Sequence, residues 1–236
     1  MRKFIYEGEA WPELQTHNIN GMRFYEVPNG DKYPSITSVL GSRPEKKKGL
    51  QEWRDRIGEA QANIISRKAA NRGTTFHHFC EDYLVDKLTE EKETELKTKN
   101  FLAWAMFGQV KKTIDERIGD IYLMEQTMFT DKFKVAGRCD LIAMFDGKPT
   151  VIDWKTATTM KKDEWNEDYY TQAAAYAYMM YEKTGELCED VAIIMVAEDG
   201  QVEVFQKKTQ NYIRRLEELM DEFYTNAMDR LKLAAA

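Results

Sequence analysis

The dipeptide Asp146-Gly147 constrains the fold of this chain more than any other feature of its sequence. Asp-Gly is a strong short-range signal for a two-residue β-hairpin loop, because both loop positions require positive φ angles. If these two residues form the loop, Phe145 faces Lys148, and counting outward brings Asp140 opposite Asp153. In this register the two aspartates form a non-hydrogen-bonded pair, whose Cα atoms lie roughly 4.5 Å apart.

Two carboxylates this close repel each other and destabilise a sheet. A divalent cation removes the conflict, because Mg²⁺ prefers oxygen ligands from one or two carboxylates, water and a substrate phosphate. Lys155 projects from the same strand face as Asp153, and Trp154 from the other. A lysine beside the ion can position or activate water and stabilise charge that grows on phosphorus. The alternative, surface aspartates paired with Arg138 and Lys155, does not explain why like charges face each other in this register.

The order of the expected elements indicates an α+β or mixed α/β fold. We expect an antiparallel three-stranded meander over residues 121–129, 133–145 and 149–154. A helix over 165–183, strands over 191–197 and 202–205 and a closing helix over 210–228 are expected to follow.

In the first third of the chain we expect a hairpin that turns at Asn29-Gly30, and then a helical pattern to about residue 86. Apolar residues at helical spacing predict one buried helix face, formed by Phe76, Phe79, Cys80, Tyr83 and Leu84. The charged stretch 86–99 indicates a solvated helix end or a linker, with a further helix from Phe101.

Composition and charge limit the class of protein. The 236 residues, 43% of them hydrophobic, suffice for one domain or for one domain with an appended subdomain. The net charge of -6 argues against a nucleic-acid partner, but residues 43–72 hold nine basic and four acidic residues. This stretch predicts either a basic binding face or an ordinary solvated helix surface.

The sequence shows no sign of a disulfide framework, a zinc site or a membrane segment. Its three cysteines are widely spaced and lack CxxC spacing, so we expect buried free thiols. No apolar run is long enough for a membrane span, and three glutamates among the first fifteen residues fit neither a secretory signal nor a transit peptide. We therefore expect a cytoplasmic protein of a bacterium or a phage-infected host, without a membrane partner.

Four short motifs occur in a fixed order. They are Gly73-Thr74-Thr75-Phe76-His77, Gly137-Arg138-Cys139-Asp140, Asp153-Trp154-Lys155, and Gln172 followed by Tyr176. In this order they resemble the GxxxH, GxxD, DxK and QxxxY motifs of the RecB-like exonuclease branch of the PD-(D/E)XK nuclease superfamily, over roughly residues 70–205. The segment 34–40 is also similar to the amino-terminal part of mitochondrial genome maintenance exonucleases and their phage relatives.

The resemblance implies a restriction-endonuclease-like core, in which helices flank a central mixed β-sheet, with an N-terminal helical part. It also implies that His77, Asp140, Asp153 and the backbone carbonyl of Trp154 bind the metal, and that Lys155 acts on the water. A histidine on a helix flank is also common as a structural residue, so both roles of His77 stay open. His78 points about 100° away on an ideal helix and is expected to have no role.

Further residues are expected to contact DNA. Gln172 and Tyr176, one helical turn apart, can donate hydrogen bonds to a phosphate or stack on a base, although Tyr176 in the core is the alternative. Ser35, Thr37 and Arg72 are expected to help the basic stretch hold the strand.

Glu125 is either a further ligand near the metal or a solvated residue, and we favour the solvated residue.

The expected activity is a metal-dependent DNA exonuclease that uses Mg²⁺, with Mn²⁺ as a substitute. Single-stranded DNA or DNA ends are the expected substrate, with 5′ to 3′ polarity, in replication, recombination or repair, and proteins of these processes are the expected partners. Alternatives are a structure-specific endonuclease on the same core and an inactive nucleic-acid binding module. No iron-sulfur cluster is expected, because the branch members that carry one use four cysteines.

We expect residues 1–232 to form a single nuclease domain, with an N-terminal hairpin and helical DNA-holding part over 1–70 and the nuclease core over 71–232. The last residues, 233–236, resemble a remnant of cloning.

Overall fold

A five-stranded mixed sheet forms the centre of the computed structural model, which describes residues 2–234 and the side chains of residues 2–226. The strand order is β4-β5-β6-β7-β8, with β7 parallel to β6 and all other neighbours antiparallel. The strands are β4 (Ile118–Thr130), β5 (Val135–Phe145), β6 (Lys148–Ala157), β7 (Asp190–Ala197) and β8 (Val202–Lys208). The predicted meander is confirmed as β4-β5-β6, and the mixed α/β class is confirmed as well.

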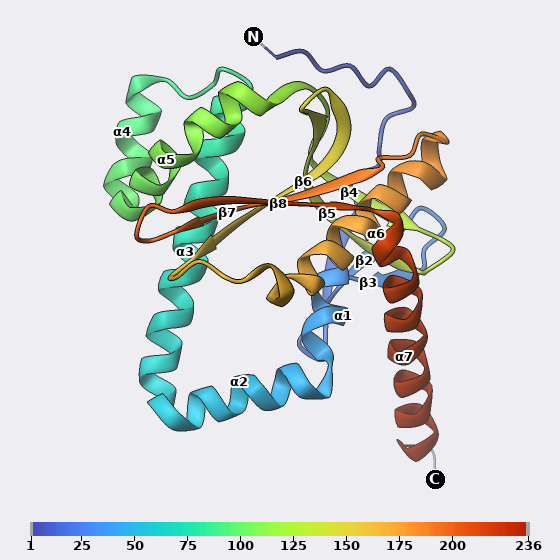
Figure 1. The fold of residues 1–236 in the computed structure, drawn as a ribbon. Coiled ribbons are helices and arrows are strands. Elements are labelled where there is room, and N and C mark those ends of the chain that lie inside the picture. The colour runs from blue at the N-terminus through green and yellow to red at the C-terminus, as the bar shows by residue number, and fades with distance from the viewer. Residues whose placement is uncertain (1, 235–236) are drawn as a thin grey trace.

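Helices cover both faces of this sheet (Figure 1). On one face lie α3 (Glu59–Leu84) and α5 (Phe101–Arg117), and on the other lie α6 (Glu167–Thr184) and α7 (Gln210–Ala234). Every residue of β7 is buried, as expected for a strand with helices on both faces. The apolar face predicted for α3 is largely confirmed, because four of its five residues are fully buried and Tyr83 is partly buried.

The β5–β6 hairpin turns at the predicted residues. Asp146 and Gly147 have φ angles of 49° and 77°, which is the positive pair that a type I′ turn requires. The predicted register holds from the pair Phe145 and Lys148 as far as the pair Leu141 and Ile152.

Beyond this point the two strands diverge, and the predicted register is wrong there. From Cys139 back to Val135, β5 pairs with β4 alone, whereas β6 continues beside β7 to Ala157. Asp140 and Asp153 are therefore not a cross-strand pair, and the same holds for Arg138 and Lys155. Here β5 stays paired with β4 and β6 stays paired with β7, so the sheet has a gap between β5 and β6.

The long helical pattern of the first third divides into three helices, α1 (Ile36–Ser42), α2 (Pro44–Ile57) and α3. Pro44 begins α2, and Gly58, whose φ is 85°, separates α2 from α3. In Figure 1, α2 runs below the sheet and joins α1 to the lower end of α3, and none of its residues is buried. The charged stretch contains a separate helix, α4 (Glu90–Lys99), which Thr89 caps by accepting a hydrogen bond from the Lys92 amide.

The N-terminal part forms a second, small antiparallel sheet of β1 (Gln15–Ile19), β2 (Met22–Glu26) and β3 (Lys32–Pro34). The hairpin predicted at Asn29-Gly30 is confirmed as β2–β3, whereas β1 was not predicted. Tyr25 and Tyr33 of this sheet pack on Ala136 of β5. A short 3₁₀ helix, η1 (Asp163–Trp165), precedes α6.

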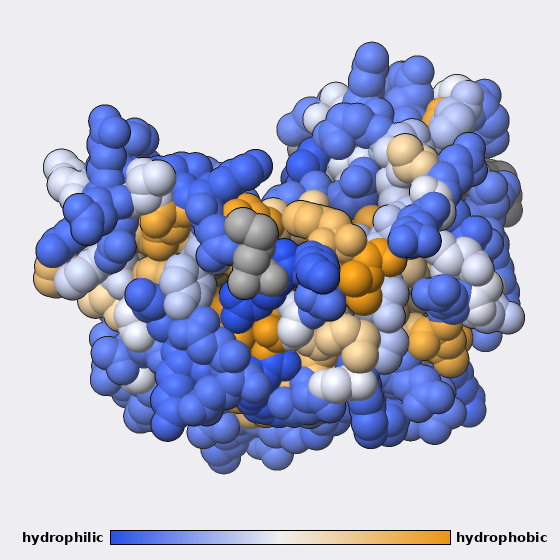
Figure 2. Space-filling view, turned by 90° about the horizontal axis from the view of Figure 1, so that it is seen from above, coloured by the Kyte–Doolittle hydropathy of each residue, from blue (hydrophilic) through white to orange (hydrophobic). Residues whose placement is uncertain are grey.

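The surface agrees with this layered arrangement. The face seen from above in Figure 2 is mostly hydrophilic, with an apolar band across its middle. Within residues 2–234, no helix combines the length and the hydropathy that crossing a membrane requires. Of the tail expected at 233–236, residues 235 and 236 lie outside the described residues.

Candidate functional site

The gap between β5 and β6 brings together most of the residues expected to bind the metal. Asp140 comes from β5, Asp153 and Lys155 come from β6, and His77 comes from α3. We call these four side chains and the Trp154 carbonyl the carboxylate site. The helices of both layers reach it, because α3 supplies His77 and α6 supplies Gln172, which is described below.

Asp140 occupies the position that a cross-strand partner of β6 would take. Its Oδ2 accepts a hydrogen bond of 3.0 Å from the Trp154 amide. The His77 ring lies between Asp140 and Trp154, with Nδ1 3.7 Å from Asp140 Oδ2 and Nε2 3.1 Å from the Trp154 carbonyl oxygen. An imidazole, a carboxylate and a carbonyl from three elements therefore lie next to one another, with the carboxylate at one ring nitrogen and the carbonyl at the other.

Asp153 is buried, with 1% of its surface exposed. Its Oδ1 accepts a hydrogen bond of 2.9 Å from Gln172 Nε2, and its Oδ2 forms an ion pair with the Lys155 ammonium. Within the described part of the chain, however, Oδ2 has no hydrogen bond of acceptable geometry. Burial raises the pKa of Asp153 to about 6, and Lys155 opposes this rise. Because the pKa stays raised beside this ammonium, the charge of Asp153 is compensated only in part, and a bound cation would stabilise it further.

Lys155 stays charged between acidic and aromatic neighbours. Burial alone would lower its pKa, but the carboxylates of Asp153 and Asp140 outweigh burial, so that the pKa is raised. Its Nζ also lies 5.0 Å from the centre of the Tyr169 ring. A lysine held in the ammonium form can stabilise negative charge or orient water, but it cannot accept a proton while it stays charged.

Two glutamates, Glu81 on α3 and Glu125 on β4, extend the site beyond His77. The ligand atoms of His77, Glu81 and Glu125 all lie within 4.8 Å of one another. Burial raises the pKa of Glu81 to about 6, where a hydrogen bond with Glu125 opposes the rise and Asp140 adds to it. Burial raises the pKa of Glu125 to about 8, and both Glu81 and Asp140 add to that rise. Our preference for a solvated Glu125 is wrong, because this side chain is partly buried beside the carboxylate site.

Glu125 also has an unusual backbone. Its φ of 49° lies in the left-handed region, which is uncommon for a residue other than glycine inside a strand. The pairs on either side of it, Met124 with Leu141 and Gln126 with Cys139, place it beside Asp140. The Arg138 guanidinium donates a hydrogen bond of 2.9 Å to the Glu125 carbonyl and so supports this conformation. The sequence did contain one sign of this acidic group, because Glu81 follows His77 by about one helical turn.

The donor set suits a hard divalent ion. Carboxylate oxygens, a backbone carbonyl and one imidazole are ligands for Mg²⁺ or Mn²⁺, whereas thiolates would favour softer metals. The three cysteines are buried and take no part in the carboxylate site. His77, Asp140, Asp153 and the Trp154 carbonyl offer donors of this kind, and among the described residues His77, Glu81 and Glu125 have ligand atoms within 4.8 Å of one another.

The residues expected to touch DNA are distributed differently from the prediction. Gln172, which is 7% exposed, orients Asp153 instead of pointing to an open surface. Tyr176 is 2% exposed, and a Cβ on Gly137 would lie 2.7 Å from its hydroxyl oxygen. Glycine at 137 thus makes room for a core tyrosine, and Tyr176 has no exposed face on which a base could stack.

Arg72 is also buried. It forms an ion pair with Glu198 and donates a hydrogen bond of 3.2 Å to Thr156 Oγ1, so its guanidinium is already engaged at the end of β6. Ser35 is buried and its hydroxyl contacts that of Thr37 at 2.8 Å. Among the five residues proposed for DNA contact, Thr37 alone is exposed.

The basic stretch contributes fewer available charges than its sequence suggests. Arg43 and Lys46 form ion pairs with Asp168, and Arg54 forms one with Glu59. Four basic side chains on α2 and α3 are exposed and form no ion pair with the described residues. These are Lys47, Arg56, Arg67 and Lys68.

Comparison with known proteins places this geometry in a family. The model of the PD-(D/E)XK nuclease superfamily matches residues 49–235, which include the carboxylate site and both glutamates. Among solved structures, the chain is similar to a protein from Eubacterium rectale that is described as a candidate exonuclease. The identity is 12%, the match covers 65% of this chain and 66% of that chain, and the TM-score is 0.44. No curated protein matches the sequence.

Proposed function

Because the chain belongs to the PD-(D/E)XK nuclease superfamily, we propose that it is a metal-dependent exonuclease of the RecB-like branch that hydrolyses DNA. The superfamily consists of nucleases that use divalent metal ions, so a nucleic-acid substrate follows from membership. The observation that supports the catalytic assignment is the convergence of Asp140, Asp153 and Lys155 where β5 and β6 diverge.

The residues of the carboxylate site have separate proposed roles. His77, Asp140, Asp153 and the Trp154 carbonyl would hold the ion, which when bound lowers the pKa of a water molecule and polarises the scissile phosphate. Gln172 fixes Asp153 through their hydrogen bond, and the Trp154 amide fixes Asp140. Lys155 would place its positive charge next to the phosphate oxygens as negative charge grows on them.

Mg²⁺ is the proposed ion, with Mn²⁺ as a substitute. Both ions accept oxygen ligands in the geometry that carboxylates and a carbonyl provide.

Single-stranded DNA or a DNA end is the proposed substrate. A protein with a net charge of -6 repels a polyanion over most of its surface, so binding depends on a local cationic region. The exposed side chains of Lys47, Arg56, Arg67 and Lys68 provide such a region on α2 and α3, and Thr37 lies on α1, which α2 follows. The 5′ to 3′ polarity and a role in replication, recombination or repair rest on the resemblance to the RecB-like branch.

An end-labelled cleavage assay tests the proposal. Linear single-stranded, linear double-stranded and circular single-stranded DNA are incubated with Mg²⁺, Mn²⁺ or EDTA, and product lengths are followed over time. We expect mononucleotides or short products from linear single strands with either metal, and no cleavage with EDTA. Cleavage of the circle would instead indicate an endonuclease.

Two variants connect this activity to the site. Asp153→Asn removes a ligand charge, and Asp146→Asn makes the same change at the other end of the hairpin, where Asn tolerates a positive φ. We expect Asp153→Asn to be inactive and Asp146→Asn to cleave like the parent protein. Equal activity of the two variants would overturn the assignment of Asp153.

A further inference from the structure

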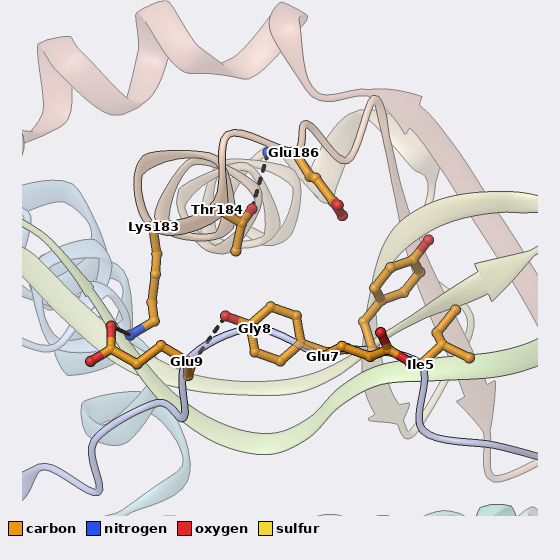
Figure 3. A pocket seen from close by; sticks show the side chains of 9 residues that line it. Ile5, Glu7, Gly8, Glu9, Lys183, Thr184 and Glu186 are labelled. Carbon is orange, nitrogen blue, oxygen red and sulfur yellow. Dashed lines mark hydrogen bonds and ion pairs between the residues drawn. The ribbon is translucent and has the colours of Figure 1, made fainter.

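Two adjoining hollows lie between the N-terminal segment and the C-terminal end of α6. The larger, of about 550 Å³, is enclosed by residues 9–12, the β2–β3 turn, the end of β4 and the end of α6. The smaller, of about 470 Å³, lies next to it along residues 5–9. Glu9 and Lys183 line both, and Figure 3 shows Lys183 reaching from α6 to Glu9, with Nζ 3.5 Å from Oε2. We call the two hollows together the N-terminal groove.

The N-terminal groove lies away from the carboxylate site. Gln172, which touches the site, and Glu182, which lines the groove, belong to the same helix. Their separation along the helix axis is roughly 15 Å. A molecule in the groove would therefore leave the catalytic centre accessible.

Aromatic and proline side chains form the apolar wall of the larger hollow. These are Trp11, Pro12, Pro28 and Phe129. Grooves lined in this way bind extended segments that contain proline, because such segments are already close to their bound conformation.

Trp11 also offers a hydrogen bond. Its side chain is 8% exposed, and its indole N–H is buried without an acceptor in the part of the chain that the structure describes. Buried tryptophan N–H groups usually have a partner. Because this N–H is covered, the carbonyl of a bound peptide would supply the missing acceptor only after the side chains around Trp11 move aside.

The acidic lining of the N-terminal groove favours a basic partner. Carboxylates of Glu9, Asp131 and Glu182 line the larger hollow, and those of Glu7 and Glu186 line the smaller one. Among the lining residues, Lys183 alone is basic, and it already contacts Glu9. This surface repels nucleic acid and attracts a cationic protein segment.

We propose that the N-terminal groove binds an extended segment of a partner protein in which proline or leucine residues stand next to arginine or lysine. The apolar residues pack on the wall with Trp11, a backbone carbonyl accepts from its indole N–H, and the basic residues meet the carboxylates. Such a contact would bring the nuclease to a partner protein without covering its catalytic centre.

Fluorescence anisotropy with two labelled peptide libraries tests this proposal on the full chain. One library alternates proline or leucine with arginine, and the other carries glutamate in place of arginine. We expect the arginine library to bind at least about tenfold more tightly, since several opposite charges meet.

Two variants locate the binding. Trp11→Phe keeps an aromatic ring and removes the N–H, and we expect about fivefold weaker binding. Glu182→Gln removes the charge but keeps an acceptor for the amides of Asp131 and Lys132, and we expect about threefold weaker binding. Glu116→Gln, on α5, is the matched control and should bind like the parent protein.

The outcomes separate this proposal from the nuclease proposal, because peptide binding does not require an active carboxylate site. The DNA cleavage rate per folded molecule of Trp11→Phe and of Glu182→Gln should equal that of the parent protein. Equal binding of both libraries, or unchanged binding by both groove variants, would overturn the proposal. Displacement of the peptide by a single-stranded oligonucleotide, or a dimer in light scattering that excludes the peptide, would equally overturn it.

Discussion

The two ends of the β5–β6 hairpin differ in how their charges and hydrogen bonds are satisfied. At the turn, the strands pair without interruption from Leu141–Ile152 to Phe145–Lys148, and the Arg117 guanidinium pairs with Asp146. At the open end the pairing stops, and Asp140 accepts a hydrogen bond from the Trp154 amide in place of a ladder partner.

Two aspartates of the same hairpin show the consequence. Arg117 lowers the pKa of Asp146, whereas burial raises the pKa of Asp153 to about 6. A carboxylate whose charge is already matched contributes to stability, and one whose charge is buried and incompletely matched is available to a ligand. The turn end thus stabilises the fold, and the open end is where we propose that the metal ion binds.

The largest expected effect comes from removing a charge at the open end. Asp140→Asn keeps an oxygen that accepts from the Trp154 amide but removes the ligand charge. We expect the rate of DNA cleavage to fall at least about a thousandfold, with the fold retained. Single-turnover cleavage of end-labelled single-stranded DNA and circular dichroism measure the two quantities. A loss of less than about tenfold would remove Asp140 from the proposed ligands.

A smaller loss is expected from removing the ammonium of the open end. Lys155→Ala should slow cleavage about a hundredfold to a thousandfold, because negative charge that grows on the phosphate oxygens loses the ammonium proposed to stabilise it. Lys148→Ala removes an exposed lysine of the same strand at the turn end and should leave the rate unchanged. Both cleavage rates are measured at saturating Mg²⁺. Equal slowing of the two variants would contradict the difference proposed between the two ends of the hairpin.

A substitution at the turn end should affect stability alone. Gly147 has a φ of 77°, so Gly147→Ala should lower the free energy of unfolding by about 1 kcal/mol. The cleavage rate per folded molecule should stay unchanged. Urea unfolding with parallel activity assays distinguishes this result from a general loss of structure, in which both quantities would fall.

The smallest expected effect is a pH dependence of stability in EDTA. Burial, Glu81 and Asp140 raise the pKa of Glu125 from 4.5 to about 8, while His77 and Arg138 lower it. A raised carboxyl pKa gives stability that is complete below about pH 4.5 and is lost as the pH rises through about 8. The free energy of unfolding should change by less than about 1 kcal/mol over this pH range, because the Glu125 carboxyl is only partly buried.

Glu125→Gln provides the control for this effect. The variant should lose less stability than the parent protein between pH 5 and pH 8, as followed by thermal melting in EDTA. An identical pH profile for both proteins would show that ionisation of Glu125 does not change the stability of the fold.

Sequence patterns predicted the local parts of this structure well. The turn at Asp146-Gly147, the register near it and the apolar face of α3 depend on neighbours in the chain, and all three are confirmed. The divergence of β5 and β6 was not predictable in this way, because it depends on β4 and β7 each holding one strand.

The candidate site shows the same limit. Asp140 accepts a hydrogen bond from the amide of Trp154, the residue that follows Asp153. The two aspartates are therefore close, but they are not the cross-strand pair that the register predicted. The sequence left open whether Tyr176 lies in the core and gave no sign that Arg72 is buried, because burial depends on packing with distant residues such as Gly137 and Glu198. The assignment of residues to one nuclease domain and to catalytic roles stays a prediction.

Binding of Mn²⁺ followed by electron paramagnetic resonance tests the central claim most directly, namely that the open end of the hairpin holds a divalent ion. The parent protein and Asp146→Asn should bind Mn²⁺ with equal affinity, and Asp140→Asn and Asp153→Asn should each bind it at least about tenfold more weakly. Parent-like Mn²⁺ affinity in both of the last two variants would contradict the account.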